Sequence, residues 1–175
     1  DHLDDVEGAI AAVKQILDLE PESTAAYRQL DSLYIQAERW YDLAQVLVER
    51  IRLAETEAER TWLRLRLAEV REEKLEDVTG AVEVYRTILQ SEPTNEDAVK
   101  QLERLFKNPD VRVEIARILL PAYEARHDAN ATFIAMEFVA GRPFDVWCAE
   151  ERPSRERLLA TLAEPLSGAT LEPPP

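Results

Sequence analysis

Apolar residues recur at three- and four-residue spacing through most of the first 127 positions. From Asp5 to Leu19 the pattern lines one face with Val6, Ala9, Ile10, Val13, Ile16 and Leu17. This periodicity is typical of amphipathic helices. Comparable stretches follow at 24–34, 40–51, 62–70, 77–89, 95–106 and 115–123. The pattern therefore predicts an all-α fold for this region, with the tryptophans of these stretches in the core.

Short polar residues and prolines predict where the helices begin and end. Side chains that can accept a hydrogen bond from the first turn stand at four expected N-caps: Asp5, Ser23 or Thr24, Asp77 and Asn95. Residues before proline avoid the α region, so Pro21 and Pro93 are expected to end two helices. Pro121 falls inside the last helix and is expected to bend it. The run 71–76 is expected to be a solvated helix face.

Segment 5–34 occurs again 72 residues later (77 − 5), at 77–106. The residues that recur unchanged are Asp5, Val6, Gly8, Ala9, Ile16, Leu17, Glu20, Pro21, Ala26, Gln29, Leu30 and Leu33. Self-similarity at a fixed distance is the signature of repeat architectures. Half of 72 gives a unit of about 36 residues, which is in the range of helical repeats built from helix pairs.

Apolar and aromatic residues stand at the landmark positions of a known family. They are Leu30, Tyr34, Trp40, Leu43 and Leu47, and then Leu67, Ala68, Ala81, Tyr85, Leu89, Glu92 and Pro93. Over roughly 5–127 the chain thus resembles tetratricopeptide-repeat proteins or their close helical relatives. The resemblance implies a right-handed α-solenoid of stacked antiparallel helix pairs. Asp31 and Glu103 depart from the family pattern, which favours a small residue at that place.

In such repeats, the place two residues before the landmark leucine faces a concave groove where peptide ligands lie. Arg28 and Lys100 hold that place, and in the middle unit Leu65 holds it, or Arg66 if the helix is rotated. The resemblance implies these partner-binding residues: Arg28, Gln36, Leu65, Arg66, Lys100 and Arg104. A cationic strip can receive the carboxylates of an acidic or C-terminal peptide. The alternative is that these basic residues only pair with acidic neighbours.

The pattern changes after position 127, which divides the chain into a repeat domain at 1–127 and a C-terminal appendage at 128–175. Within the appendage, 132–140 (TFIAMEFVA) reads as a short strand. A turn, a short helix at 154–162 and a proline-rich end follow. Residues 133–147 are similar to the hinge segment of bacterial Ser/Thr protein kinases. That resemblance implies that backbone groups of Glu137 and Val139 contact adenine.

Phosphoryl transfer needs a glycine-rich loop, a phosphate-binding lysine, a catalytic aspartate and a metal-binding aspartate. The sequence contains no G-x-G-x-x-G, H-R-D or D-F-G motif. We therefore expect no enzyme activity and no cofactor. The leading prediction is a protein-interaction scaffold that binds a peptide or partner protein in the concave groove. The alternative is the regulatory repeat region of a bacterial Ser/Thr kinase or kinase-associated protein.

The net charge of −14 argues against binding nucleic acid or an anionic membrane, since both need basic surface. No apolar run reaches the ~20 residues that span a bilayer. The single cysteine, Cys148, cannot form an internal disulfide, which fits a reducing, cytoplasmic location. His2 and His127 lack further ligands at metal-binding spacing, so no metal site is expected.

The first helix is expected to be the second member of a helix pair. A repeat unit relies on its neighbours to bury its apolar face. We therefore expect Val6, Ile10, Val13 and Leu17 to be partly uncovered. An uncovered end of this kind predicts self-association through the open ends of the stack.

Overall fold

A computed structural model describes residues 2–126, and this part of the chain is all-helical, without strands. Its elements are α1 (His2–Leu19), α2 (Thr24–Gln36), α3 (Trp40–Leu53), α4 (Glu57–Glu69), the π-helical turn η1 (Val70–Lys74), α5 (Val78–Ser91), α6 (Glu96–Leu105) and α7 (Arg112–Ala125). The prediction of an all-α fold is confirmed for these residues. The strand, turn and helix expected after position 127 lie outside them.

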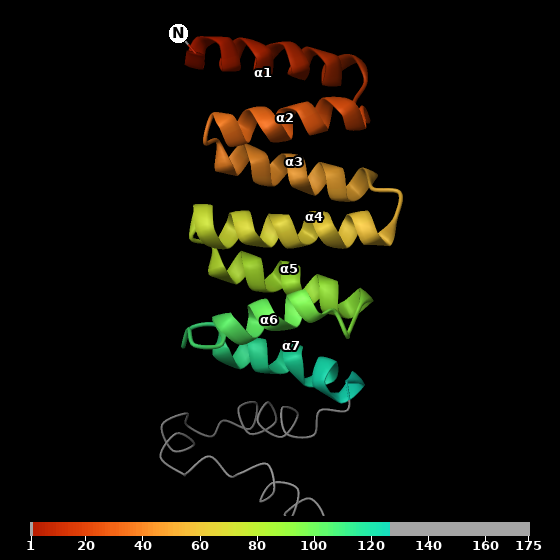
Figure 1. The fold of residues 1–175 in the computed structure, drawn as a ribbon, viewed down its shortest axis with the longest axis vertical. Coiled ribbons are helices and arrows are strands. Elements are labelled where there is room, and N and C mark those ends of the chain that lie inside the picture. The colour runs from red at the N-terminus through yellow and green to blue at the C-terminus, as the bar shows by residue number, and fades with distance from the viewer. Residues whose placement is uncertain (1, 127–175) are drawn as a thin grey trace, which may run out of the picture.

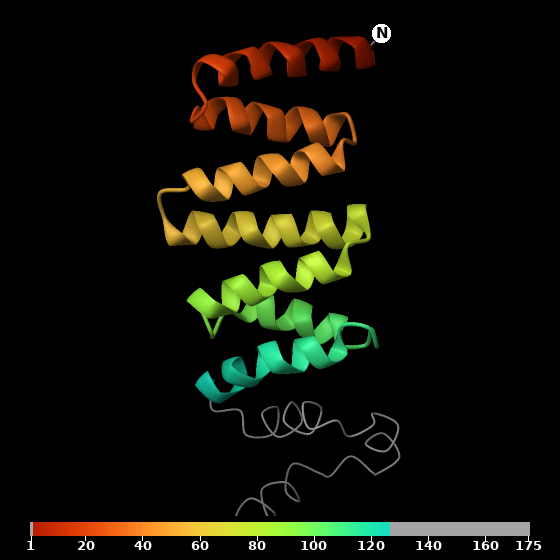
Figure 2. The ribbon, with the colours of Figure 1, turned by 180° about the vertical axis from the view of Figure 1, so that it is seen from behind.

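The helices lie one beside the next in chain order, and successive helices run in opposite directions, from α1 at one end to α7 at the other (Figure 1). Each α-helix packs against its neighbour in the chain, and α5 also contacts α7. Seen from the opposite side, α5 and α7 lie in front of α6 (Figure 2). Helices next to each other in sequence are therefore also next to each other in space.

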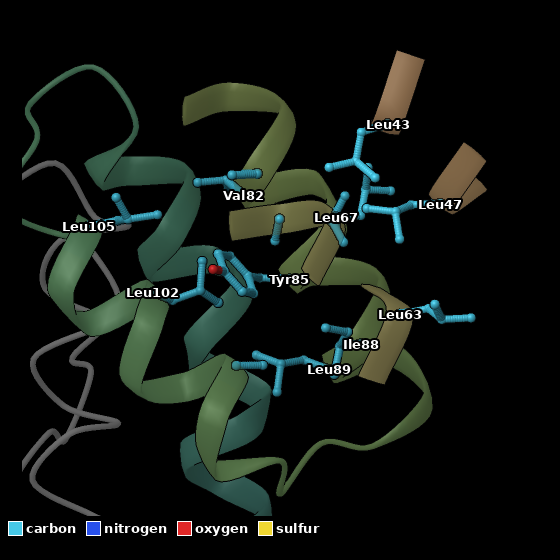
Figure 3. Close-up of a cluster of buried hydrophobic side chains, with 14 of the residues drawn as sticks. Leu43, Leu47, Leu63, Leu67, Val82, Tyr85, Ile88, Leu89, Leu102 and Leu105 are labelled. Carbon is cyan, nitrogen blue, oxygen red and sulfur yellow. The ribbon is translucent and has the colours of Figure 1, made fainter. Parts of the chain in front are cut away.

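One continuous apolar core runs along the stack. Its fully buried side chains come from successive helices: Leu43 and Leu47 from α3, Leu63 from α4, Tyr85 and Ile88 from α5, and Leu102 from α6 (Figure 3). Each such side chain contributes about 1.5–3 kcal/mol relative to exposure. The residues expected inside the second, third, fifth and sixth helices supply most of this core, so the three- and four-residue spacing located it correctly.

The capping predictions were partly right. The Gly80 N–H donates to Asp77 Oδ1 at 2.8 Å, and the Ala98 N–H donates to Asn95 Oδ1 at 3.0 Å. Both caps are confirmed. Asp5 is not a cap, because α1 begins at His2 and places Asp5 inside the helix. Ser23 holds the N-cap position of α2, but its side chain makes no capping bond.

The run 71–76, expected to be a solvated helix face, keeps Glu73, Lys74 and Glu76 exposed, but most of it lies in the π-helical turn. Arg71 Nη1 donates to the Gly80 carbonyl at 3.1 Å, and Lys74 Nζ lies 5.1 Å from the ring centroid of Trp40. The turn ends at Lys74, and Glu76, just beyond it, has a left-handed φ of 54°. The segment therefore ties the end of α4 to the start of α5 and to α3.

The apolar face of α1 is less open than expected. Val6, Ile10 and Val13 are buried, with 7% exposure or less, because they face α2. Between residues 5 and 19, the exposed large apolar side chains are Ile16 and Leu19, at 43% and 85%. Ile16 was expected to pack, but it lies on a neighbouring stripe of the helix that α2 does not cover. Self-association through the end of the stack stays a prediction.

Pro121 lies inside α7, as expected. No helix among residues 2–126 is long and apolar enough to cross a membrane.

Candidate interaction surface

Ion pairs join alternate helices along one side of the stack. Arg28 of α2 lies 3.8 Å from Glu59 of α4, measured between Nη2 and Oε1. Arg104 of α6 lies 2.6 Å from Glu72 of η1, which continues α4. These pairs show that α2, α4 with η1, and α6 present side chains to a common face. We call it the alternate-helix surface, and its residues are Arg28, Glu59, Trp62, Arg66, Glu72, Lys100 and Arg104.

Asp31 is the buried centre of this surface. The residue is 4% exposed, and its carboxylate accepts hydrogen bonds from two arginines. Arg66 of α4 donates from Nη1 and Nη2 at 2.8 and 2.9 Å, and Arg50 of α3 donates from Nη1. Bidentate arginine–carboxylate contacts are among the stronger hydrogen bonds in proteins. Asp31 therefore fastens three consecutive helices to one another.

Trp62 lies beside these arginines and is half-exposed, at 50%. The guanidinium carbons of Arg66 and Arg50 lie 5.2 and 6.0 Å from its ring centroid, within the range of cation–π attraction. The expectation that this tryptophan belongs to the core is wrong. By contrast, Trp40 is half-buried and packs against the core.

A pocket of about 150 Å³ adjoins the cluster where α2, α3 and α4 meet. Its lining residues are Thr24, Arg28, Arg50, Leu53, Ala54, Glu55 and Glu59. The lining is mixed in charge, with two arginines and two glutamates. Arg50 belongs to both the pocket and the cluster around Asp31, so the two features are continuous.

Four of the residues expected to bind a partner carry an acidic neighbour. Arg28, Arg66 and Arg104 make the contacts described above, and Lys100 Nζ lies 3.5 Å from Glu96 of its own helix. Leu65 is half-buried and packs against the core. Of the two residues considered for the groove position of the middle unit, Arg66 is therefore the one that offers a polar side chain. Gln36 is exposed at the last position of α2. A role of all six residues in partner binding stays a prediction.

A buried hydroxyl lies near the same surface. Tyr85 of α5 is fully buried, and within residues 2–126 its Oη has no hydrogen-bond partner. Burial, with a smaller contribution from the Glu72 carboxylate, raises the pKa of this hydroxyl well above its usual range. It therefore resists ionisation at alkaline pH more strongly than an exposed tyrosine does.

Asp31, Arg50 and Trp62 were not among the candidate residues from the sequence. One feature of the sequence singled out Asp31: it is acidic at a position where the pattern used for the sequence comparison favours a small residue. Glu103 holds the corresponding place 72 residues later (103 − 31), and its Oε1 accepts a hydrogen bond from the Tyr123 hydroxyl at 3.0 Å. In both units the unusual acidic residue thus bonds to the following helix.

The chain matches no family, no curated protein and no solved structure among those with which it was compared. Among residues 2–126 no group of three or more acidic, histidine or cysteine side chains is placed to hold a metal ion. The kinase-like segment at 133–147 lies outside the described residues. Its role in adenine contact, and the kinase-related alternative, stay predictions.

Proposed function

We propose that residues 5–127 form a right-handed α-solenoid of the tetratricopeptide type. The 72-residue internal repeat and the antiparallel packing of successive helices in chain order support this proposal. In such an array each unit contacts only its neighbours, and the repeated placement of side chains builds an extended surface.

We further propose that the protein is a non-enzymatic scaffold that binds an acidic peptide or partner segment on the alternate-helix surface. The observation that carries this proposal is the alignment of basic side chains from α2, α4 and α6 on one side of the stack. Arg28 and Lys100 are the most exposed of them, with side-chain exposures of 64% and 66%. Surface of this kind attracts carboxylates even when the net charge of the protein is negative. The single cysteine supports a cytoplasmic location.

The spacing of these side chains fits an extended peptide. Neighbouring packed helices lie about 10 Å apart, so the four helix-to-helix steps from α2 to α6 span at most about 40 Å. An extended chain advances about 3.3 Å per residue. Carboxylates at most about twelve residues apart can therefore meet Arg28 and Lys100 in one bound peptide.

The ion pairs already present limit how much each basic side chain contributes. A carboxylate of the ligand must displace Glu59 from Arg28, or Glu96 from Lys100. Exposed charge contacts of this kind contribute about 0.2–1 kcal/mol each. Affinity is therefore expected to fall as salt screens the contacts.

A peptide array tests the proposal on the full chain. Acidic peptides are compared with versions in which glutamine and asparagine replace the acids, all with blocked termini. We expect the acidic versions to bind better and the substitutions Arg28→Ala and Lys100→Ala each to weaken them. Equal binding of acidic and neutral peptides, or unchanged affinity in both variants, would leave these residues as a solvated face and overturn the proposal.

A further inference from the structure

Trp62 is a large aromatic side chain that the fold leaves half in water. Burying apolar surface yields about 25 cal/mol per Å², so an exposed indole is costly unless something covers it. Tryptophan and arginine are also the residue types most enriched among energetic hot spots of interfaces. Here one tryptophan and two arginines lie in contact on a surface that already carries a proposed binding function.

The indole is held in place before any ligand arrives. Both arginines beside its ring are fixed by the same acceptor, the buried Asp31 carboxylate. Their side chains are only 12% and 25% exposed. A pre-organised contact surface loses little conformational entropy on binding. Trp62 therefore differs from the exposed Tyr41 of α3, for which no such contact is seen within residues 2–126.

The adjoining pocket offers unused hydrogen-bond donors. Arg50 lines it, and among residues 2–126 only Nη1 of this guanidinium has an acceptor, the Asp31 carboxylate. The Nε and Nη2 groups have no acceptor among the described residues and remain available, on a side chain that is 12% exposed. Arg28 lines the same pocket, and its only ion pair there, to Glu59, is long at 3.8 Å. Two guanidinium groups with free donors, in a space of about 150 Å³, suit one planar carboxylate.

The pocket also discriminates between anions. Glu55 and Glu59 line it together with the arginines. A dianion such as a phosphate group would be repelled by both glutamates, whereas a carboxylate brings a single negative charge. The apolar part of a ligand has a place beside it, because Glu59 and Trp62 are one helical turn apart on α4.

We propose that Trp62 and this pocket are the anchor of the alternate-helix surface. The anchor takes an aspartate or glutamate side chain of a partner segment that also carries a leucine, isoleucine or phenylalanine within two positions. The carboxylate binds between Arg28 and Arg50, and the apolar side chain covers Trp62. This inference rests on the proposed scaffold function, but it concentrates the binding energy where α2, α3 and α4 meet, away from Lys100 and Arg104 of α6.

The experiment is a selection from a random library of peptides of about twelve residues, long enough to cross the surface when extended. The termini are blocked so that only side chains supply carboxylates. We expect selected peptides to share an acid within two positions of a large apolar residue. Their affinity should fall at least about tenfold with Trp62→Ala, as for other hot spots, and severalfold with Arg28→Gln. Tyr41→Ala, which removes an exposed aromatic side chain elsewhere, should change nothing.

The outcomes separate this inference from the function on which it rests. Failure to select any binding peptide would overturn both. Peptides that bind and keep their affinity in Trp62→Ala would leave the scaffold function standing and overturn the anchor. Selected peptides without an acid, or a preference for phosphoserine over glutamate, would overturn the pocket assignment. If Trp62→Ala does not keep its helical circular dichroism, Trp62→Leu and Arg28→Gln supply the same comparison.

Discussion

Replacing Asp31 with alanine should lower the free energy of unfolding more than removing any other single charged side chain of the ion pairs described above. The substitution removes three charge-assisted hydrogen bonds and leaves two guanidinium groups without their shared partner. Breaking a buried ion pair costs about 3–5 kcal/mol, because an uncompensated charge stays behind. Arg66 is 25% exposed and can turn toward water, whereas Arg50 at 12% cannot do so as readily. The lower end of that range, about 3 kcal/mol, is therefore expected.

A double-mutant cycle separates the pair from the cavity left by the carboxylate. Arg50→Leu removes the charge that Asp31→Ala would strand, and replacing buried ions with apolar groups is often neutral. The double variant should therefore be less destabilised than the sum of the single variants, with a coupling energy of about 2 kcal/mol. Asp42→Ala is the matched control. It breaks the pair with Arg39, in which both side chains are about one-third exposed, and it should cost less than about 1 kcal/mol.

Urea unfolding followed by far-ultraviolet circular dichroism gives the free energies of unfolding. Stacked helical units can open locally, so hydrogen exchange of the amides in α2, α3 and α4 reports where the loss occurs. Protection should fall in these three helices first. Two results would refute the conclusion that Asp31 holds three helices together. One is a loss of unfolding free energy in Asp31→Ala no larger than in Asp42→Ala, and the other is a coupling energy near zero.

Three smaller predictions follow from backbone and carboxylate geometry. Glu38 has a left-handed φ of 53°, so Glu38→Gly should stabilise by about 1 kcal/mol in urea unfolding, and a loss would contradict this. Gly8→Ala should stabilise the fold by about 0.5–1 kcal/mol. Gly80→Ala should lack this gain, because its Cβ would overlap the capping carboxylate of Asp77. Equal effects of the two substitutions in urea unfolding would contradict the cap. Hydrogen bonds from the Asn95 amide and then from the Thr61 hydroxyl lower the pKa of Glu92. Thr61→Val should raise that pKa toward its ordinary value, as NMR titration can show. Because the lowered pKa stabilises the fold fully above the ordinary value near 4.5, the cost of Thr61→Val should be present at neutral pH and vanish as pH falls through the folded-state pKa.

Local signals in the sequence were enough to place the helices. Apolar spacing depends on neighbours three and four residues away, and the caps at Asp77 and Asn95 act over three residues. Such features can be read directly from a short window. The wrong expectation at Asp5 has the same origin, because a capping residue type is common inside helices as well.

The long-range contacts could not be read in this way. Asp31 meets Arg50 and Arg66 at separations of 19 and 35 residues, and many other arginines stand at comparable distances along the chain. The rotation of α4 that turns Trp62 outward and Leu65 inward depends on packing against both neighbouring helices. The π-helical turn likewise has no spacing signature of its own in the sequence. These features decide the candidate surface, so its main residues emerged only from the fold.

An NMR titration of the full chain with the tightest selected peptide tests the proposed surface most directly. The chain has three tryptophans, and their indole N–H signals serve as reporters. We predict that the signal of Trp62 shifts progressively to saturation, together with the backbone amides of Arg28 and Arg66. The signal of Trp40, which lies beside Lys74, should stay in place. Shifts confined to α1, α5 and α7, or an unmoved Trp62 signal at saturation, would contradict binding on the alternate-helix surface.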